Sequence, residues 1–175
     1  MSNVLVVVDM QNDFIDMALG TPEAQAIVQN VVDKINNFEG KVFATLDTHF
    51  DDYMDTAEGK KLPVPHCIRG TEGWRVNKDV KKALKNKEAQ FIEKNTFGST
   101  LLPMSICDAT RLNDNDTIEI VGLCTDICVV SNALILKAEF PDITMKVDSK
   151  CCAGVTPAKH EAALEVMRSC QIDVE

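Results

Sequence analysis

Five short segments rich in β-branched or apolar residues recur along the chain, and segments with helical character separate them. These segments are Val4–Val8, Val42–Leu46, Gln90–Glu93, Thr117–Val121 and Ile143–Val147. Runs of this length and composition predict β-strands, and strands that alternate with helices predict a parallel sheet. The pattern therefore predicts an α/β fold with a mostly parallel central sheet.

Helix signals lie between these segments. Thr21 offers an N-cap and Pro22 suits the first helical position. Ile27, Val31 and Ile35 then recur every four residues, which indicates one buried helical face. The predicted helices cover residues 22–38, 77–87, 127–140 and 157–170.

The segment 47–77 has little periodicity and contains several glycines and prolines. Unstructured segments of this length in compact domains are usually functional or disordered. The chain shows no internal repeat, low-complexity tract or linker, so we expect one domain over residues 1–175.

The net charge and the length of the apolar runs argue against nucleic-acid and membrane partners. The 175 residues include 18 Lys and Arg against 27 Asp and Glu, a formal charge of −9, and no basic stripe appears. This balance argues against a nucleic-acid partner. The first apolar run ends at Asp9, far short of the roughly 20 residues that cross a bilayer. We therefore expect a cytoplasmic protein with no membrane partner.

Cysteine count and chain length bear on the cofactors. Seven cysteines in a chain without an export signal predict reduced thiols. A chain of this length buries roughly 70% of its unfolded surface, so it needs neither disulfides nor a structural metal. A metal site in it would therefore indicate function.

Residues capable of chemistry follow the predicted strands. Asp9 ends the first strand and Lys94 follows the third, and open parallel sheets bind ligands beyond the carboxyl ends of their strands. Considered alone, Asp9 fits a loop cap as well as it fits a functional group. Considered alone, Lys94 fits an ordinary solvated surface lysine. The same capping explanation is favoured for Asp13.

Metal-binding residue types gather around the second strand. Asp47 and His49 are two residues apart in an extended segment, so their side chains point to one face. His66 follows in the proline-containing segment, and Glu58 lies between them. Two histidines with one or two carboxylates suit Zn, Mn or Fe. By spacing alone, a surface acid beside a turn histidine explains Asp47 and His49 as well.

Cys128 lies at the predicted first turn of the helix that follows the fourth strand. Helix N-termini lower thiol pKa values and offer N–H groups to an oxyanion, so a nucleophilic cysteine is one interpretation. A small buried core residue is the other. A redox or zinc-binding pair with Cys124 is disfavoured, because the spacing is four and no second pair follows. Placed together, Asp9, Lys94 and Cys128 form one constellation from three strand ends.

This constellation belongs to a set of motifs that spans nearly the whole chain. The motifs are Val7–Phe14, Asp47–His49, Pro65–Cys67, Gly70–Gly73, Glu93–Ser99, Gly122–Val129 and His160–Leu164. In this order they resemble the isochorismatase-like cysteine hydrolases and, within them, the nicotinamidases, also called pyrazinamidases. The resemblance implies a three-layer α/β/α fold.

The resemblance also implies roles for the strand-end residues. Asp9, Lys94 and Cys128 match a catalytic triad in which the cysteine attacks a carboxamide carbonyl. The backbone N–H groups of Cys124 and Cys128 match an oxyanion hole, and the peptide bond between Leu123 and Cys124 is expected to be cis.

By the same resemblance Asp47, His49 and His66 match the ligands of a divalent metal, and Glu58 falls where some nicotinamidases have a fourth. Zinc is the first expectation, with manganese or iron as alternatives. The metal would orient the pyridine nitrogen of nicotinamide.

The substrate pocket is expected to contain aromatic side chains. Phe14 matches an aromatic of the family pocket, while Trp74 and Phe97 are further candidates to face the ring.

The activity implied is hydrolysis of nicotinamide to nicotinate and ammonia through a thioester, within NAD salvage. The partner is then a small-molecule amide, and self-association into a homo-oligomer is compatible with the family. The alternative within the family is a cysteine amidohydrolase acting on a carbamoyl, ureido or small aliphatic amide. Isochorismatase activity proper is disfavoured because it uses no cysteine nucleophile.

Two readings from other classes remain. The first is a non-enzymatic binding protein on the same fold, which the filled triad and metal positions disfavour. The second is a thiol redox sensor, although the adjacent Cys151 and Cys152 are poorly placed for a disulfide.

Overall fold

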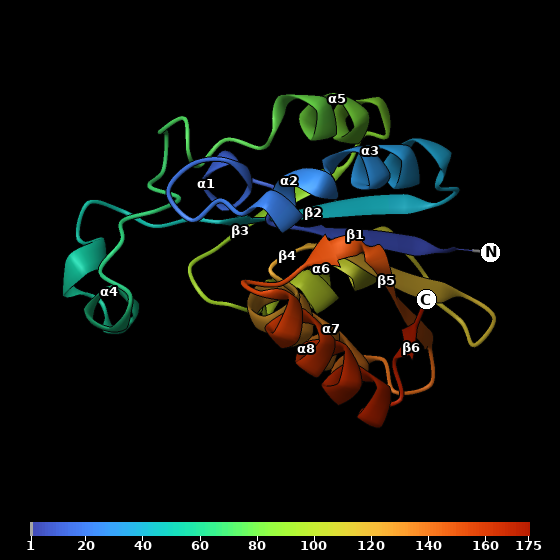
Figure 1. The fold of residues 1–175 in the computed structure, drawn as a ribbon. Coiled ribbons are helices and arrows are strands. Elements are labelled where there is room, and N and C mark those ends of the chain that lie inside the picture. Colours follow the sequence, from blue (N-terminus) through green and yellow to red (C-terminus); the bar gives the residue numbers. More distant parts are fainter. Residues whose placement is uncertain (1) are drawn as a thin grey trace.

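The protein, seen in a computed structural model that describes residues 2–175, is built around a six-stranded parallel sheet (Figure 1). The strands are β1 (Val4–Val8), β2 (Lys41–Asp47), β3 (Gln90–Lys94), β4 (Thr117–Leu123), β5 (Thr144–Ala153) and β6 (Asp173–Val174). Their spatial order is β3-β2-β1-β4-β5-β6, and every neighbouring pair is parallel. The predicted α/β class with a parallel sheet is confirmed.

Helices cover both faces of the sheet and complete three layers (Figure 1). One face carries α1 (Asn12–Ile15), α2 (Pro22–Ala26), α3 (Val28–Asn37) and α5 (Lys78–Asn86). The other carries α6 (Leu101–Ala109), α7 (Val130–Glu139) and α8 (Pro157–Ser169). Among residues 2–175, no helix combines the length and apolarity needed to cross a membrane.

Side-chain alternation along β1 divides the core in two. Leu5 and Val7 pack with the helices of the first face, whereas Val4, Val6 and Val8 pack with those of the second. All five side chains are buried. A strand buried on both faces reads as a continuous apolar run, which is why the sequence pattern locates it well.

The predicted helix over 22–38 is two helices, α2 and α3, interrupted at Ile27. The backbone of Ile27 stays in the right-handed region, with φ −85° and ψ −11°. Ile27, Val31 and Ile35 therefore still bury one continuous face. Hydrophobic periodicity cannot detect a break of one residue that leaves this face intact.

The fifth strand is longer than predicted and continues to Ala153. Its pairing with β4 shifts register between Ile120 and Gly122, after which Cys152 pairs with Gly122. The mixed composition of this second half hid it from the sequence pattern. Helix α6 was also not predicted, because its apolar residues run almost continuously instead of lining one face.

A projecting segment lies between β2 and α5, beyond the carboxyl edge of the sheet (Figure 1). It contains a short 3₁₀ turn, Tyr53–Asp55, and the helix α4, Ala57–Lys61. Thr56 caps α4 by accepting a hydrogen bond from the N–H of Gly59 at 3.0 Å. The segment therefore has local structure of its own.

Gly122 provides a test of how closely β4 must approach β1. Its φ is +121°, and a Cβ there would lie 2.1 Å from the carbonyl oxygen of Val8. Gly70 has φ +87° but no atom within 4 Å of the same position. We expect Gly122→Ala to lower the free energy of unfolding by about 3 kcal/mol or more, because backbone must move. Gly70→Ala should cost about 1 kcal/mol, from its backbone conformation alone. Urea unfolding of both variants measures this difference, and equal losses would contradict it.

Candidate active site

Four neighbouring strands each deliver one reactive side chain to the carboxyl edge of the sheet. Asp9 follows β1, Asp47 ends β2, Lys94 ends β3, and Cys128 follows β4 after a short turn. Asp47 and Lys94 are direct partners in the strand register. Parallel strands with matched ends thus bring together residues far apart in the sequence.

Asp9 and Lys94 form a buried ion pair. Lys94 Nζ lies 2.7 Å from Asp9 Oδ2, and their side chains are 2% and 0% exposed. Thr45 Oγ1 donates a hydrogen bond of 2.7 Å to Asp9 Oδ1. Apart from Lys94, Oδ2 has no hydrogen-bond partner among the described residues. This oxygen is therefore the one able to accept a proton.

Cys128 lies within a single π-helical turn, Thr125–Val129, immediately before α7. The sequence predicted it in the first turn of the helix; the structure makes that first turn π-helical, and α7 continues directly from it at Val130. Lys94 Nζ donates to its Sγ at 3.5 Å, and Asn132 Nδ2 donates to its carbonyl oxygen at 2.8 Å. The thiol is thus held at the lysine of the ion pair.

The peptide bond between Leu123 and Cys124 is cis, as the resemblance implied. It joins the end of β4 to the turn that carries Cys128.

Burial sets the protonation of these three groups. It raises the pKa of Asp9, although the nearby Lys94 charge opposes the rise. It also raises the pKa of the Cys128 thiol well above its usual range, and the Asp9 charge adds to this. Burial alone would lower the pKa of Lys94, but Asp9 and Cys128 outweigh it and hold that pKa above its usual range. Each of the three groups thus has a pKa raised above its usual range.

A second cluster lies beside the first. Asp47 Oδ2 is 3.1 Å from His49 Nε2 and 3.4 Å from His66 Nε2. Glu58 approaches the same two nitrogens at 3.9 Å and 3.7 Å. The predicted ligands Asp47, His49 and His66 place one donor atom each within 4.8 Å of one another.

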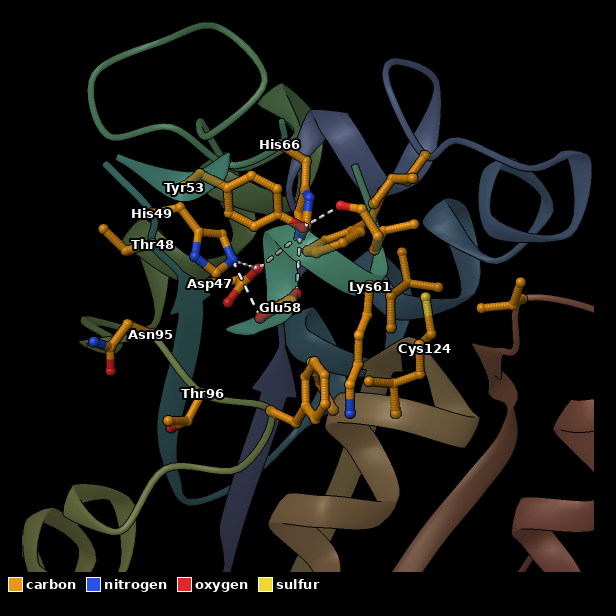
Figure 2. A pocket seen from close by; sticks show the side chains of 18 of the residues that line it. Asp47, Thr48, His49, Tyr53, Glu58, Lys61, His66, Asn95, Thr96 and Cys124 are labelled. Carbon is orange, nitrogen blue, oxygen red and sulfur yellow. Dashed lines mark hydrogen bonds and ion pairs between the residues drawn. The ribbon is translucent and has the colours of Figure 1, made fainter. Parts of the chain in front are cut away.

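The donor set fits a divalent metal. His66 Nδ1 lies 2.9 Å from the carbonyl oxygen of Val64, so its Nε2 is the nitrogen directed at the cluster. Such a second partner is typical of a metal-binding histidine. Figure 2 shows the side chains of Asp47, His49, His66 and Glu58 pointing toward one another. Two imidazoles and two carboxylates suit zinc, manganese or iron.

A cavity of about 830 Å³ joins the two clusters. Its wall includes Cys128, Cys124, the four candidate metal-binding residues, Phe14, Phe97 and Lys61. Trp74 is not among the described residues of this wall. Its indole N–H instead donates to Thr48 Oγ1 at 2.9 Å, which places it behind the end of β2. The phenylalanine and tyrosine residues of the wall are Phe14, Phe50, Tyr53 and Phe97.

The sequence analysis did not predict two residues that contact the site, Thr45 and Tyr53. Thr45 reaches Asp9, and it shares a strand face with Asp47 two residues later, a signal that was available. Tyr53 packs its ring edge-on against His49 and His66, with centroids 4.8 Å and 5.1 Å apart. No sequence pattern indicated this packing, because it depends on the fold of the projecting segment.

Comparison with known proteins identifies the family. The family model for the isochorismatase domain matches residues 3–175. A nicotinamidase/pyrazinamidase from Bacillus subtilis has 25% identity and a TM-score of 0.83, over 99% of both chains. A pyrazinamidase of Pyrococcus horikoshii, solved in complex with zinc, has 24% identity and a TM-score of 0.78, over 100% of this chain and 99% of that one.

An N-carbamoylsarcosine amidase from Thermoplasma acidophilum shares the fold as well, at 24% identity and a TM-score of 0.76, over 100% of this chain and 96% of that one. The search of curated proteins gives no match. The resemblance inferred from the motifs is confirmed: the chain belongs to the isochorismatase family.

Proposed function

We propose that this protein is a metal-dependent amide hydrolase that converts nicotinamide to nicotinate and ammonia, a reaction of pyridine-nucleotide salvage. One observation carries the proposal: a single cavity has the buried thiol of Cys128 in its wall together with two histidines and two carboxylates, and the buried Lys94–Asp9 pair contacts that thiol from behind. The family, and neighbours that are amidases, support amide hydrolysis. The Bacillus subtilis neighbour supports nicotinamide as the substrate.

The reaction begins with proton transfer from the thiol. Asp9 accepts the proton of Cys128 on Oδ2, and the sulfur adds to the carboxamide carbon. The backbone N–H groups of Cys124 and Cys128 stabilise the negative oxygen of the tetrahedral intermediate. Lys94 stays protonated throughout and offsets the negative charge that moves between aspartate and sulfur.

The second half releases both products. The carbon–nitrogen bond breaks, and ammonia leaves with the proton that Asp9 returns to the nitrogen. Water then adds to the thioester while Asp9 accepts its proton. The carbon–sulfur bond breaks, nicotinate leaves, and the thiol regains its proton. Each step uses a group within reach of Cys128.

The metal cluster suits the other end of the substrate. Asp47, His49, His66 and Glu58 would hold the ion, which supplies a Lewis-acidic contact to a ring nitrogen. The zinc in the Pyrococcus horikoshii neighbour supports zinc as the ion. Phe14 offers an apolar wall for a planar ring, since it lines the cavity and lies 5.5 Å from the His66 ring.

A carbamoyl or ureido amide is the second candidate substrate. The N-carbamoylsarcosine amidase among the structural neighbours favours it. The cavity of about 830 Å³ also exceeds what one pyridine carboxamide fills, and Lys61 adds a cation to its wall. Ammonia release from nicotinamide and from a panel of ureido acids separates the two candidates.

Replacing the nucleophile tests the chemistry. Cys128→Ala should lower ammonia release from nicotinamide by about 10⁴-fold or more, because no other group can form the thioester. Its circular dichroism spectrum and unfolding midpoint should match the wild type, since the side chain is small. Cys107→Ala, a change at an exposed cysteine, is the matched control. Turnover by Cys128→Ala near the wild-type rate would exclude this mechanism.

Metal removal tests the division of labour. Chelation should raise the KM for nicotinamide at least about tenfold, because the ring nitrogen loses its partner. Benzamide has the same carboxamide but no ring nitrogen, so its slow hydrolysis should change much less. Readdition of Zn²⁺ should restore the nicotinamide rate. Equal losses for both amides would show that the metal acts on the chemical step instead.

The pH profile tests Asp9 as the base. The hydrogen bond from Thr45 stabilises the Asp9 carboxylate, so Thr45→Val should raise the pKa of Asp9 further. A base must be deprotonated to act, so activity is lost as pH falls through this pKa. The acidic limb of kcat/KM should therefore move to higher pH in Thr45→Val. Thr117 is the first residue of β4, at the edge of the sheet away from Asp9, so Thr117→Val should leave the acidic limb in place. An unmoved limb in Thr45→Val would exclude Asp9 as its origin.

A further inference from the structure

The loop that follows β1 contacts both segments that carry the candidate metal ligands. One segment is the end of β2, with Asp47 and His49, and the other contains His66. The contacts come from residues 11–13, which end the loop and begin α1. The same three residues also contact residues 73–76. The same loop begins at Asp9.

The side chain of Gln11 forms hydrogen bonds with both the N–H and the carbonyl group of Asp47. Its Oε1 accepts the Asp47 N–H at 2.8 Å, and its Nε2 donates to the Asp47 carbonyl oxygen at 2.8 Å. Nε2 also donates to the carbonyl oxygen of Trp74 at 2.8 Å. The side chain is fully buried. All its hydrogen bonds thus go to other segments, and two go to a single candidate ligand.

Asp13 holds the other segment. Its Oδ2 accepts the N–H of Cys67, the residue after His66, at 2.7 Å. A Cβ on Gly73 would lie 2.1 Å from the same oxygen, so the carboxylate fills the space that this glycine leaves. A loop cap alone would bond within its own loop. Asp13 makes only a longer bond of that kind, 3.3 Å from the N–H of Ala18.

We propose that Gln11 and Asp13 are positioning residues that set the spacing between the two ligand segments, Gln11 through Asp47 and Asp13 through His66. This inference rests on the metal site of the proposed function. It adds that affinity for the metal depends on two side chains that touch neither metal nor substrate. It also implies that the metal cluster and the candidate base Asp9 are held by one short loop.

The backbone of the loop is secured independently of these side chains. Asn12 donates its N–H to the carbonyl of Arg75 at 2.9 Å, and Asn77 donates to that of Met10 at 2.9 Å. Removal of a single side chain should therefore leave the chain folded while the ligand segments lose their fixed spacing.

Zinc affinity of the metal-free protein tests the inference. Competition with a chromophoric chelator gives the Kd for Zn²⁺ without any assay of activity. Gln11→Met and Asp13→Ala should each weaken Zn²⁺ binding about tenfold to a hundredfold, the usual effect of groups that orient ligands. Asp13→Asn keeps an acceptor for the Cys67 N–H, so it should recover most of the wild-type affinity.

Asn12→Ala is the matched control within the same loop. Its side chain is only partly buried and donates to the Glu72 carbonyl, away from both ligand segments, so the Kd should stay within about twofold of wild type. Urea unfolding of the metal-free proteins separates positioning from general damage, since positioning predicts weakened Zn²⁺ binding without a matching fall in the midpoint. If Gln11→Met does not fold, Asp13→Ala and its Asn counterpart decide the question on the His66 side.

The outcomes separate this inference from the proposed function. Wild-type protein that binds no Zn²⁺, Mn²⁺ or Fe²⁺ would overturn the metal site itself and this inference with it. Wild-type protein that binds Zn²⁺, with folded Gln11→Met and Asp13→Ala variants of unchanged Kd, would overturn only the positioning roles. Loss of affinity in proportion to loss of stability would also overturn them.

Discussion

The buried ion pair between Asp9 and Lys94 is the constraint on which the site depends. Two charges removed from water are tolerated only when each has a partner at close range. The pair connects the ends of β1 and β3 across β2, so it fixes how three neighbouring strands end relative to one another. Cys128 lies against the same lysine, with its Sγ 3.5 Å from Lys94 Nζ, so the thiol and the carboxylate share one buried cation.

Asp47 links that ion pair to the second cluster. Its Oδ1 lies 3.6 Å from Lys94 Nζ, while its Oδ2 faces His49 and His66. Burial would raise the pKa of Asp47, but hydrogen bonding to both histidines and the Lys94 charge outweigh burial and hold that pKa below its usual range. One carboxylate thus serves two sites, and a cation bound at the histidines would compete with the lysine for its charge.

The sequence indicates the parts of this site that the sheet determines. Asp9, Asp47 and Lys94 are read from the ends of apolar runs, because parallel strands place their carboxyl ends along one edge. The orientation of Trp74 could not be predicted in this way. An aromatic near the motifs was expected at the ring, yet its orientation depends on a hydrogen bond to Thr48 that no pattern encodes.

The same limit applies to contacts across loops. The three hydrogen bonds of Gln11 and the packing of Tyr53 join segments whose mutual approach follows from the whole fold. The break at Ile27 and the late half of β5 were missed for a simpler reason. The break leaves the spacing of buried residues unchanged, so periodicity predicts one continuous helix. The second half of β5 lacks a strand-like pattern, so it was assigned to a loop.

The sheet and the projecting segment contribute different residues to the candidate site. Asp9, Lys94 and Cys128 come from strand ends and from the turn after β4. Glu58, Lys61 and His66 come instead from the segment between β2 and α5. The hydrogen bonds from Gln11 to Trp74 and from the Cys67 N–H to Asp13 are where the projecting segment is joined to the loop after β1.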